Sequence, residues 1–451
     1  MPYLPHSPDD IERMLRAIGI PDVEALWEQV PPALRLRRPL DLPDGLDDVT
    51  LSARMEALAA RSRGASLSFL GAGAYDHATH PVVDQILLRS EFLTSYTPYQ
   101  PEASQGTLQA IFEFQTMVCE LLGLDVANAS LYDGASAVAE AVLMARRLSG
   151  RERVLLSAAL PPQVRATVGT YLSGVGPQAA SEVPYDPAGG AVDLDALRRA
   201  AAGGAACVVL GYPNHFGVPE NIEAAARICC DAGAYLVSHT PDPFVLGLLK
   251  PPGELDVAIA AAEGQPLGLP LSFGGPGVGL LAVRTEFVRQ MPGRFVGETV
   301  DVHGDRAYVL TLATREQHIR RDKATSNVCT NHGLCALAVT IHLSLLGPAG
   351  FRRTAEKCHS TARRLVAALR ADCGIELAFD APYLHEFAVR RPRGGLAAAA
   401  AALERDGIVL GAPLAPDYPE LADCRLLAVT ERTTDEDCDR LVAALRAAPG
   451  K

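Results

Sequence analysis

Lysine is scarce in this chain, and one long stretch has none at all. Among 451 residues only Lys250, Lys323, Lys357 and Lys451 are lysines, so most of the 41 cationic residues are arginines. No lysine lies between Lys250 and Lys323. Because a lysine amine is the group that forms an imine with a carbonyl compound, this gap excludes a covalent imine site from the middle of the chain.

Disulfide and membrane signals are missing as well. The ten cysteines are scattered without a C-x-x-C pair, and the adjacent Cys229 and Cys230 cannot bridge in normal geometry. We therefore expect reduced thiols and a cytoplasmic location, and we predict no metal site. The N-terminus lacks the basic start and apolar run of a signal peptide, and we expect no apolar stretch of membrane-spanning length.

An excess of positive charge is also absent. The formal net charge of −12 argues against a nucleic-acid partner, which needs a basic face. The 48% hydrophobic and 21% charged residues indicate a folded globular protein. A chain of 451 residues is too long for one simple core, so two domains and an arm are expected.

Hydrophobic periodicity divides the chain into three parts. Residues 1–62 are predicted to form a helical arm, which either wraps a partner subunit or caps its own domain. Residues 63–330 are predicted to form a large α/β domain, and residues 331–451 a linking helix and a small α+β domain.

The large domain shows short apolar runs between helical stretches, which is typical of a mostly parallel sheet buried on both faces. Its predicted strands are 153–156, 206–210, 234–237, 256–259 and 279–283, with helices at 136–148, 162–175 and 219–232. The arm helices are predicted at 7–18 and 48–62, and a helical region at 307–345. The small domain has predicted strands at 375–380, 384–390 and 424–429, and helices at 352–371, 394–406 and 434–447.

A turn of small residues opens the helix predicted at 136–148. Asp133, Gly134 and Ala135 follow a short apolar run, and free N–H groups at a helix N-terminus bind anions. Transferases of fold type I hold the phosphate of pyridoxal 5'-phosphate (PLP) on such a turn. The alternative is a plain helix cap made by Asp133 or Ser136.

Two strand ends could line the same cofactor. Asn214 lies in the turn 212–217, which either lines the cofactor ring or is an ordinary β-turn, and its neighbour His215 could be a ligand or base. Asp242 follows the strand 236–239 and could pair with a protonated pyridine nitrogen. The segment 263–277 stands where a PLP lysine would be expected, but Gln265 cannot form an imine.

The segment 96–106 is the most distinctive part of the chain, and we call it the tyrosine loop. Tyr96, Tyr99, Gln100, Glu102 and Gln105 are held here by two prolines, which lower the entropy cost of presenting polar side chains. A hydrophobic core would not require this mixture. We therefore predict an active-site or subunit-interface wall rather than a simple surface loop.

Several segments together resemble one known family. They are residues 69–73, 91–94, 96–106, 131–135, 264–268, 273–276, 297–301 and 315–327. The chain resembles subunit 1 (alpha) of the split glycine cleavage system P-protein over essentially its full length. The segments 238–243 and 212–215 depart from the usual pattern of that family.

The resemblance implies an aminotransferase-like PLP transferase of fold type I, a decarboxylating glycine dehydrogenase, in which this subunit lacks the PLP lysine. PLP would sit on a lysine of subunit 2 (beta), in a heterotetramer of two alpha and two beta subunits. Glycine would lose CO2, and its aminomethyl group would pass to the lipoyl arm of H-protein, which works with T- and L-proteins. Two alternatives stay open, a self-sufficient PLP-dependent transaminase or decarboxylase that uses Lys323 and a non-catalytic stabilising subunit.

Overall fold

The computed structural model describes residues 5–61, 64–174, 176, 179–312 and 316–448. The chain divides into two compact units, Met1–Gly64 and Ala65–Lys451. The predicted helix ends at residues 62 and 175, and the first residue of the motif 315–327, lie outside the described residues.

The first unit contains the two predicted arm helices. Helix α1 (Pro8–Ile18) begins at Ser7, whose hydroxyl accepts from the backbone N–H of Asp10 in a capping box, and it ends at Gly19. Helix α2 (Asp48–Arg61) follows two short 3-10 turns, η1 (Val23–Trp27) and η2 (Pro32–Leu34). Every described residue of this unit is exposed or half-buried, so the described part of the arm has no core of its own.

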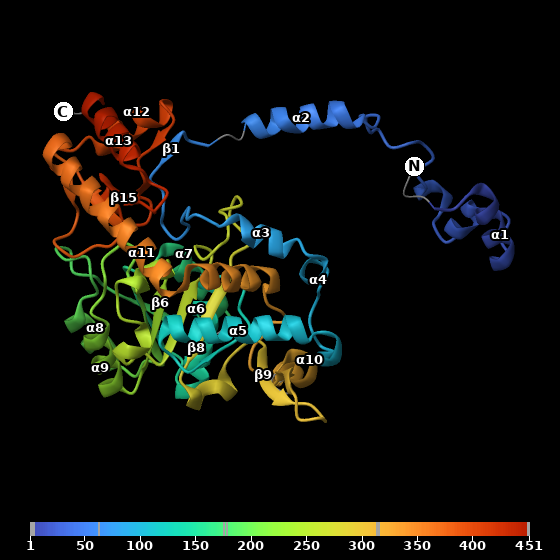
Figure 1. The fold of residues 1–451 in the computed structure, drawn as a ribbon, viewed down its shortest axis with the longest axis horizontal. Helices are drawn as coiled ribbons and strands as arrows, with labels where there is room; N and C mark the ends of the chain where they lie inside the picture. The colour runs from blue at the N-terminus through green and yellow to red at the C-terminus, as the bar shows by residue number, and fades with distance from the viewer. Residues whose placement is uncertain (1–4, 62–63, 175, 177–178, 313–315, 449–451) are drawn as a thin grey trace. The chain divides into compact units, whose positions relative to one another are not determined.

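A seven-stranded sheet forms the centre of the second unit (Figure 1). Its order is β2-β8-β7-β6-β5-β3-β4; β4, β3, β5, β6 and β7 pair in parallel, whereas β8 and β2 pair antiparallel. The strands are β2 (Val126–Ala127), β3 (Val154–Ser157), β4 (Ala180–Val183), β5 (Cys207–Gly211), β6 (Tyr235–Thr240), β7 (Ile259–Glu263) and β8 (Gly279–Val283). The mostly parallel sheet is therefore present, although β7 begins where the strand predicted at 256–259 ends.

Helices cover both faces of this sheet. Successive strand residues alternate between two hydrophobic clusters; for example, Val208 belongs to one cluster and Val209 to the other. Residues of α5, α8, α9 and α11 complete the first cluster, and residues of α6 and α7 complete the second. These helices are α5 (Gln105–Leu122), α6 (Gly134–Ser149), α7 (Pro162–Leu172), α8 (Leu194–Ala201), α9 (Ile222–Ala232) and α11 (Gly333–Cys373).

The C-terminal part of this unit carries a four-stranded antiparallel sheet of order β11-β12-β15-β14. Its elements are β11 (Glu376–Leu377), β12 (Glu386–Arg390), β14 (Ala412–Pro413), β15 (Cys424–Ala428), α12 (Leu396–Arg405) and α13 (Asp435–Ala447). The short β1 (Leu67–Ser68) pairs with β13 (Ile408–Val409), so the chain segment at residue 67 packs with the C-terminal part and not with the large sheet.

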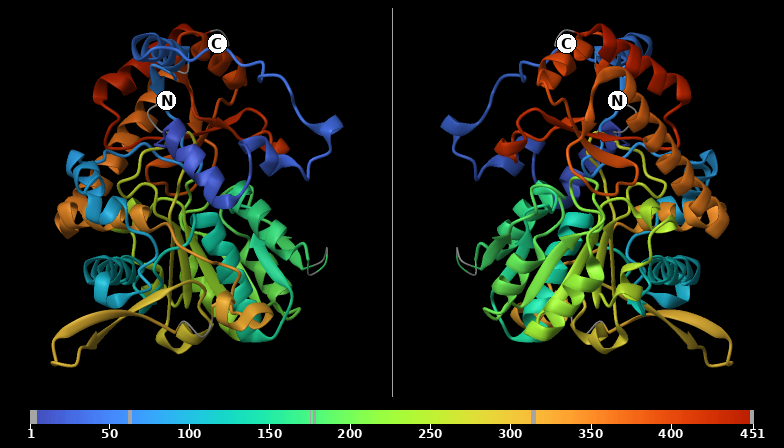
Figure 2. Two further views of the ribbon diagram at one scale, coloured as in Figure 1. Left: turned by 90° about the vertical axis from the view of Figure 1, so that its right-hand side faces the viewer. Right: turned by 90° about the vertical axis from the view of Figure 1, so that its left-hand side faces the viewer.

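The helical region predicted over 307–345 is wrong in its first part. Residues 295–311 form an antiparallel hairpin, β9 (Phe295–Val300) with β10 (Arg306–Thr311), which extends from the edge of the large sheet (Figure 2). Only one residue of β10, Tyr308, is buried, so its sequence lacks the alternation of apolar and polar residues that marks a strand. Short helices complete the region and the segment before α5: α3 (Pro81–Leu87), α4 (Ser90–Leu93) and α10 (Gln317–Arg320).

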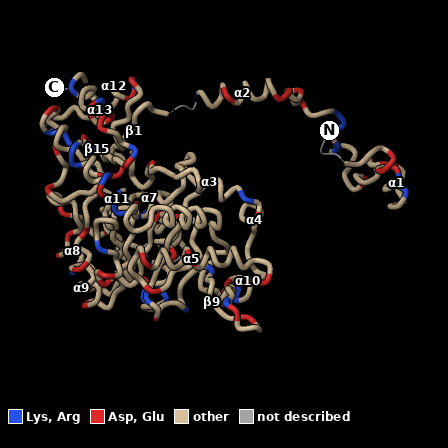
Figure 3. The backbone as a smooth tube through the Cα atoms, viewed as in Figure 1, with Lys and Arg blue, Asp and Glu red and all other residues tan. Residues whose placement is uncertain are grey.

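Helix α11 corrects another expectation. It is long and apolar enough to cross a membrane by length and composition alone, which the sequence reasoning did not anticipate. The helix is broken by a non-helical residue at Gly347, before Pro348, and buried residues on both sides of this kink belong to hydrophobic clusters of the fold. This is the usual environment of a core helix. Basic and acidic residues are interspersed along the chain, in keeping with its modest acidic charge (Figure 3).

Candidate functional site

A buried arginine fixes the tyrosine loop. The Arg294 guanidinium donates from Nη2 to the Tyr99 hydroxyl at 2.8 Å and to the Cys329 carbonyl at 2.6 Å. Its Nη1 donates to the hydroxyls of Thr97 and Thr330 at 3.3 and 3.0 Å. The guanidinium also lies over the Tyr99 ring, 5.2 Å from its centroid. One side chain therefore joins the tyrosine loop to the segment that precedes α11.

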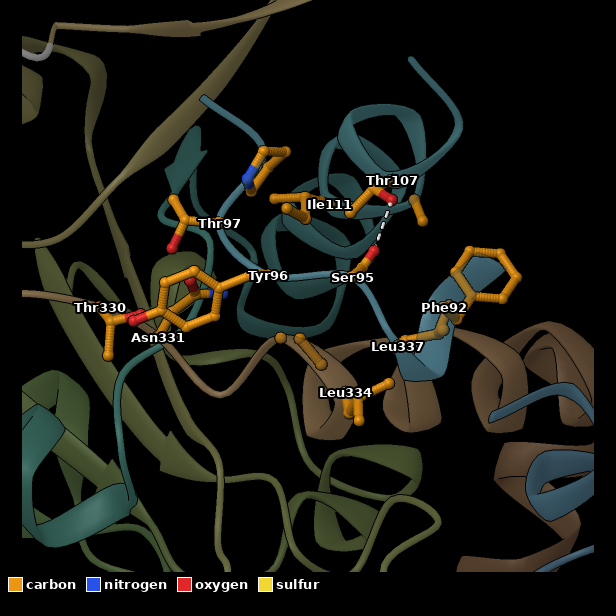
Figure 4. Close-up of a pocket in the computed structure, with 14 residues that line it drawn as sticks. Phe92, Ser95, Tyr96, Thr97, Thr107, Ile111, Thr330, Asn331, Leu334 and Leu337 are labelled. Carbon is orange, nitrogen blue, oxygen red and sulfur yellow. Dashed lines mark hydrogen bonds between the residues drawn. The ribbon is translucent and has the colours of Figure 1, made fainter. Parts of the chain in front are cut away.

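Two of the residues that Arg294 bonds to border a pocket of about 130 Å³ (Figure 4). Tyr96 and Thr97 line it from the tyrosine loop, Ile111 from α5, Asn331 from the segment before α11, and Leu334 from the first turn of α11. The lining is mixed, with apolar side chains beside hydroxyl and amide groups, and the volume suits one side chain or a very small ligand. Tyr96 is 87% exposed, so most of its ring is accessible from outside the chain.

The five candidate residues of the tyrosine loop play different parts. Gln105 is tied down, since its amide donates to the carbonyls of Pro101 and Tyr308 and accepts from the Tyr308 N–H. It fastens the loop to strand β10 and does not line the pocket. Tyr99 is anchored by Arg294. Tyr96, Gln100 and Glu102 are exposed, so these three side chains are the ones that remain available to a partner or substrate.

The turn at Asp133–Ala135 holds a carboxylate of the chain itself. Asp133 caps α6 by accepting from the Ser136 N–H at 2.7 Å. The Glu263 carboxylate accepts from the N–H of Gly134 at 2.7 Å, and from the N–H groups of Gln265 and Val278 at 2.8 and 3.1 Å. Burial raises the pKa of Glu263 to about 7, against the opposing effect of these three N–H groups.

There is no room beside this carboxylate. A Cβ on Gly134 would lie 2.9 Å from the Cβ of Glu263, and one on Gly277 would lie 3.1 Å from its Oε1. An anion at the N-terminus of α6 is therefore supplied by Glu263, in the position where a phosphate would accept the same N–H groups.

Asp242 is also engaged within the chain. Its Oδ2 lies 2.8 Å from Nε2 of His77 and 2.8 Å from Nε2 of His385. The Nδ1 of His77 lies 2.6 Å from a carboxylate oxygen of Glu431. Burial lowers the pKa of His77, but the carboxylates of Asp242 and Glu431 raise it to about 10. The same histidines hold the pKa of Asp242 far below its usual range despite burial. The acid proposed for a pyridine nitrogen thus already faces a protonated imidazole.

Gln265, in the segment without lysine, is bonded to the backbone of the chain, whereas residues 270–274 of the same segment are exposed. Gln265 accepts from the backbone N–H of Tyr75 and donates to the carbonyls of Tyr75 and Leu269. The Tyr75 hydroxyl donates to Glu386 at 2.8 Å, and burial raises the pKa of Glu386 to about 7. These contacts join the segment near β1 to both sheets.

The turn 212–217 is structural. The Asn214 amide donates to the Gly190 carbonyl and to Glu220, and its oxygen accepts from the N–H groups of Phe216 and Val218. All of its hydrogen-bonding groups are satisfied inside the chain, so the structure favours the β-turn alternative.

The neighbouring His215 has a packing role as well. Its ring stacks on Tyr418 with centroids 5.7 Å apart, and burial lowers its pKa to about 4. An imidazole held neutral in an aromatic environment is typical of a packed core histidine.

Neither central lysine is placed for imine chemistry. The Lys250 amine is exposed and lies 4.0 Å from Glu223 on α9. Lys323 is exposed in the short 3-10 turn η8 (Arg321–Lys323). Together with the filled positions at α6 and Asp242, this means that the residues of this chain do not fit PLP.

Sequence reasoning missed five residues that organise these regions: Arg294, Glu263, His77, His385 and Glu431. Among these five residues, only Glu263 had a signal in the sequence, because it lies in the segment where a PLP lysine was expected. The others are single polar residues whose partners are far away in the sequence, so no spacing pattern marks them.

Comparison with known proteins decides the family. The family model described as Glycine cleavage system P-protein matches residues 1–445. The chain belongs to the glycine cleavage system P-protein family.

A relative from Sorangium cellulosum (strain So ce56), named "Probable glycine dehydrogenase (decarboxylating) subunit 1", is 53% identical over 449 residues and covers 99% of each chain. A solved structure titled as glycine decarboxylase (P-protein) of the glycine cleavage system, in inhibitor-bound form, is 41% identical, with a TM-score of 0.88 over 99% of this chain and 100% of that one.

A more distant structure supports the fold alone. Glutamate decarboxylase from Lactobacillus brevis is 15% identical, with a TM-score of 0.68 over 92% of this chain and 96% of that one. The predicted α/β fold of the PLP transferase type I class is therefore confirmed, and so is the resemblance to subunit 1 of the P-protein.

Proposed function

We propose that this chain is subunit 1 of a two-subunit glycine decarboxylase, the aminomethyl-transferring, decarboxylating glycine dehydrogenase of a cytoplasmic glycine cleavage system. With subunit 2 it removes CO2 from glycine and passes the aminomethyl group to the lipoyl arm of H-protein, in a system completed by T- and L-proteins. Full-length similarity to relatives named subunit 1 supports this assignment.

Subunit 2 supplies the PLP lysine in this proposal, and the two subunits assemble as a heterotetramer with two copies of each. The support from this chain is the set of positions described above. Glu263 occupies the N-terminus of α6, Asp242 is paired with His77, and Gln265 stands in the lysine segment. A chain with these residues contributes to the reaction through a site completed by its partner.

The tyrosine loop is the part of this chain that we assign to the shared site. Arg294 donates a hydrogen bond to the Tyr99 hydroxyl, and Gln105 binds the loop to the backbone of β10. Tyr96 and Glu102 are exposed. A rigid loop presents its side chains to a partner at low entropy cost. We infer that Tyr96 and Glu102 orient groups in a pocket shared with subunit 2 and exclude water from it. The exposure of Tyr96 on a loop whose neighbouring residues are hydrogen-bonded to Arg294 is the observation that carries this role.

The test is co-expression with a candidate subunit 2, followed by a glycine–bicarbonate exchange assay. Tyr96→Ala and Glu102→Ala are expected to lower exchange by at least about tenfold, the loss of one oriented contact, while the complex still assembles. Gln109→Ala, an exposed glutamine on the next turn of α5, serves as the matched control and is expected to keep the full rate. Unchanged exchange in Tyr96→Ala and Glu102→Ala would remove the assigned role.

Two other functions are separated by simple measurements. A self-sufficient PLP enzyme that uses Lys323 would yield a PLP-labelled peptide from this chain alone after borohydride reduction, and we expect none. A purely stabilising subunit would leave subunit 2 fully active by itself once it is folded and soluble, and we expect that activity to be lost.

A further inference from the structure

Three buried side chains from distant segments bring metal-ligating atoms together. His77 precedes α3, Asp242 follows β6, and His385 precedes β12. The two imidazole Nε2 atoms each lie 2.8 Å from Asp242 Oδ2, and all three ligand atoms lie within 4.8 Å of one another. Each residue is at most 5% exposed, so the group is enclosed by protein.

The orientation of the His77 ring is set by Glu431, on the side of the ring opposite to Asp242. Its Nδ1 lies 2.6 Å from Glu431 Oε2, which leaves Nε2 directed at Asp242. A carboxylate on the far nitrogen of a histidine is the usual outer contact of a metal-binding imidazole, because it fixes the ring and its tautomer. His385 is a second, independent indication of a ligand at this point. His385 Nε2 is buried and close to Asp242, yet it has no hydrogen bond of acceptable geometry.

We propose that His77, Asp242 and His385 bind one divalent transition-metal ion, for which Zn²⁺ is the fitting probe. Two imidazole nitrogens and one carboxylate oxygen are ligands that Zn²⁺ accepts. With bonds of about 2.0–2.2 Å, ligand atoms of a tetrahedral site stand about 3.3–3.6 Å apart, so each of the two His–Asp pairs, which lie at 2.8 Å, must open by roughly 0.5–0.8 Å. The ion takes the place of the proton between His77 and Asp242.

A second grouping of His77, Cys358 and Glu431 overlaps with this one. It is the weaker candidate, because the Cys358 thiol donates to Glu431 at 3.5 Å and the same carboxylate also accepts from the Ala78 N–H at 2.6 Å. A thiol must be deprotonated to bind a metal well. Glu431 therefore supports the histidine, and the ion lies on the Asp242 side.

An ion at this point would have a structural effect. Asp242 follows the large-sheet strand β6, whereas His385 directly precedes β12 of the small sheet. Segments next to both sheets would be joined through a single centre. Metal binding to the folded chain alone raises its apparent stability, because the unfolded chain lacks the assembled site. The role is independent of the decarboxylation assigned above.

Metal content tests the site directly. The full chain is incubated with equimolar ZnSO4, loosely held ion is removed with dilute EDTA, and zinc is measured by mass spectrometry. About one zinc per chain and a higher thermal midpoint are expected for the natural chain and for the control His303→Asn, whose histidine is exposed. His385→Gln, which replaces the imidazole with a neutral amide that binds zinc poorly, is expected to hold less than a tenth of that zinc.

X-ray absorption of the zinc-loaded natural chain provides a measurement that needs no variant. Two imidazoles and oxygen ligands are expected. Sulfur ligands would place the ion at Cys358 or at exposed thiols such as Cys230 and Cys329, and either result would overturn the proposal. So would a natural chain that holds no zinc, since the cluster would then be a hydrogen-bonded ion pair only, or zinc retained in full by His385→Gln.

Discussion

Replacing Arg294 is the sharpest test of how the tyrosine loop is held. The substitution Arg294→Met keeps an unbranched side chain of similar reach and removes the guanidinium. Four hydrogen bonds to Thr97, Tyr99, Cys329 and Thr330 disappear with it. Glu316 also loses a cation 3.8 Å away.

The size of the effect follows from burial. The side chains of Arg294 and Glu316 are 5% and 11% exposed, so solvent does not replace the lost contacts. Breaking a buried ion pair by removing one partner costs about 3–5 kcal/mol, and Glu316 would keep its contact with His318, whose Nδ1 lies 3.5 Å away. We assign this cost to opening of the loop, because most of the lost bonds end on the loop or on the segment beside it.

Hydrogen exchange measures that opening. A cost of about 3 kcal/mol or more corresponds to at least a hundredfold faster exchange of protected loop amides. Suitable reporters are the N–H groups of Tyr99, Ala103 and Ser104, which are hydrogen-bonded within the loop. Decarboxylation by the assembled enzyme should fall in parallel.

Two further variants serve as an intermediate case and as a control for Arg294→Met. Arg294→Lys keeps the charge but cannot reach four acceptors at once, so an intermediate exchange rate is expected. Arg284→Met removes a guanidinium that is 40% exposed and lies 3.5 Å from an exposed Asp256, and it should change stability by less than about 0.5 kcal/mol. If the loop amides of folded Arg294→Met exchanged as in the natural chain, Arg294 would not be what holds the loop.

Two further predictions concern the packed interior. Gly217→Ala should lower the free energy of unfolding by about 3 kcal/mol or more in urea titrations, because φ is +79° and a Cβ would lie 2.0 Å from the Glu386 carbonyl oxygen. The control Gly169→Ala has open space at its Cβ and should not destabilise the chain. The raised pKa of Glu263, about 7 against 4.5 for an ordinary glutamate, stabilises the fold fully below pH 4.5, and this contribution is lost as pH rises through 7. Between pH 6 and pH 8 the loss is about 1 kcal/mol, so Glu263→Gln should flatten the pH dependence of stability by that amount, and an unchanged slope would contradict the raised pKa.

Local sequence signals predicted five of the seven strands of the large sheet, because each of these carries its own evidence, whereas the strands β2 and β4 were not predicted. The run at residues 207–211 is apolar throughout, and such a run between two helices can hardly be anything but a strand buried on both faces. The hairpin 295–311 gave no such signal, because its strands are partly exposed and mix charged with aromatic residues. Its stability comes from α5, where Gln105 and Gln115 bond to its backbone, and these contacts span about 200 residues of sequence.

The candidate site also has a part that local sequence signals could predict and a part that depends on contacts between distant residues. The tyrosine loop stood out because prolines, tyrosines and amides are adjacent in the chain, and a local mixture can be recognised locally. The division of roles within it could not be predicted, since it depends on Arg294 and Tyr308, each about 200 residues away. The same limit applies to His77 and Asp242, which meet only after the fold is complete.

The lysine gap is thus one part of a larger change in the chain. A lysine put in place of Gln265 would find the Glu263 carboxylate on the N–H groups that a phosphate needs, and His77 on the acid that a pyridine nitrogen needs. It would also remove an amide that bonds to the backbone of Tyr75 and Leu269. Because each cofactor contact is replaced by a contact that stabilises the fold, no single substitution returns imine chemistry to this chain. What the chain can still offer a reaction lies on its surface, in the rigid tyrosine loop that faces outward.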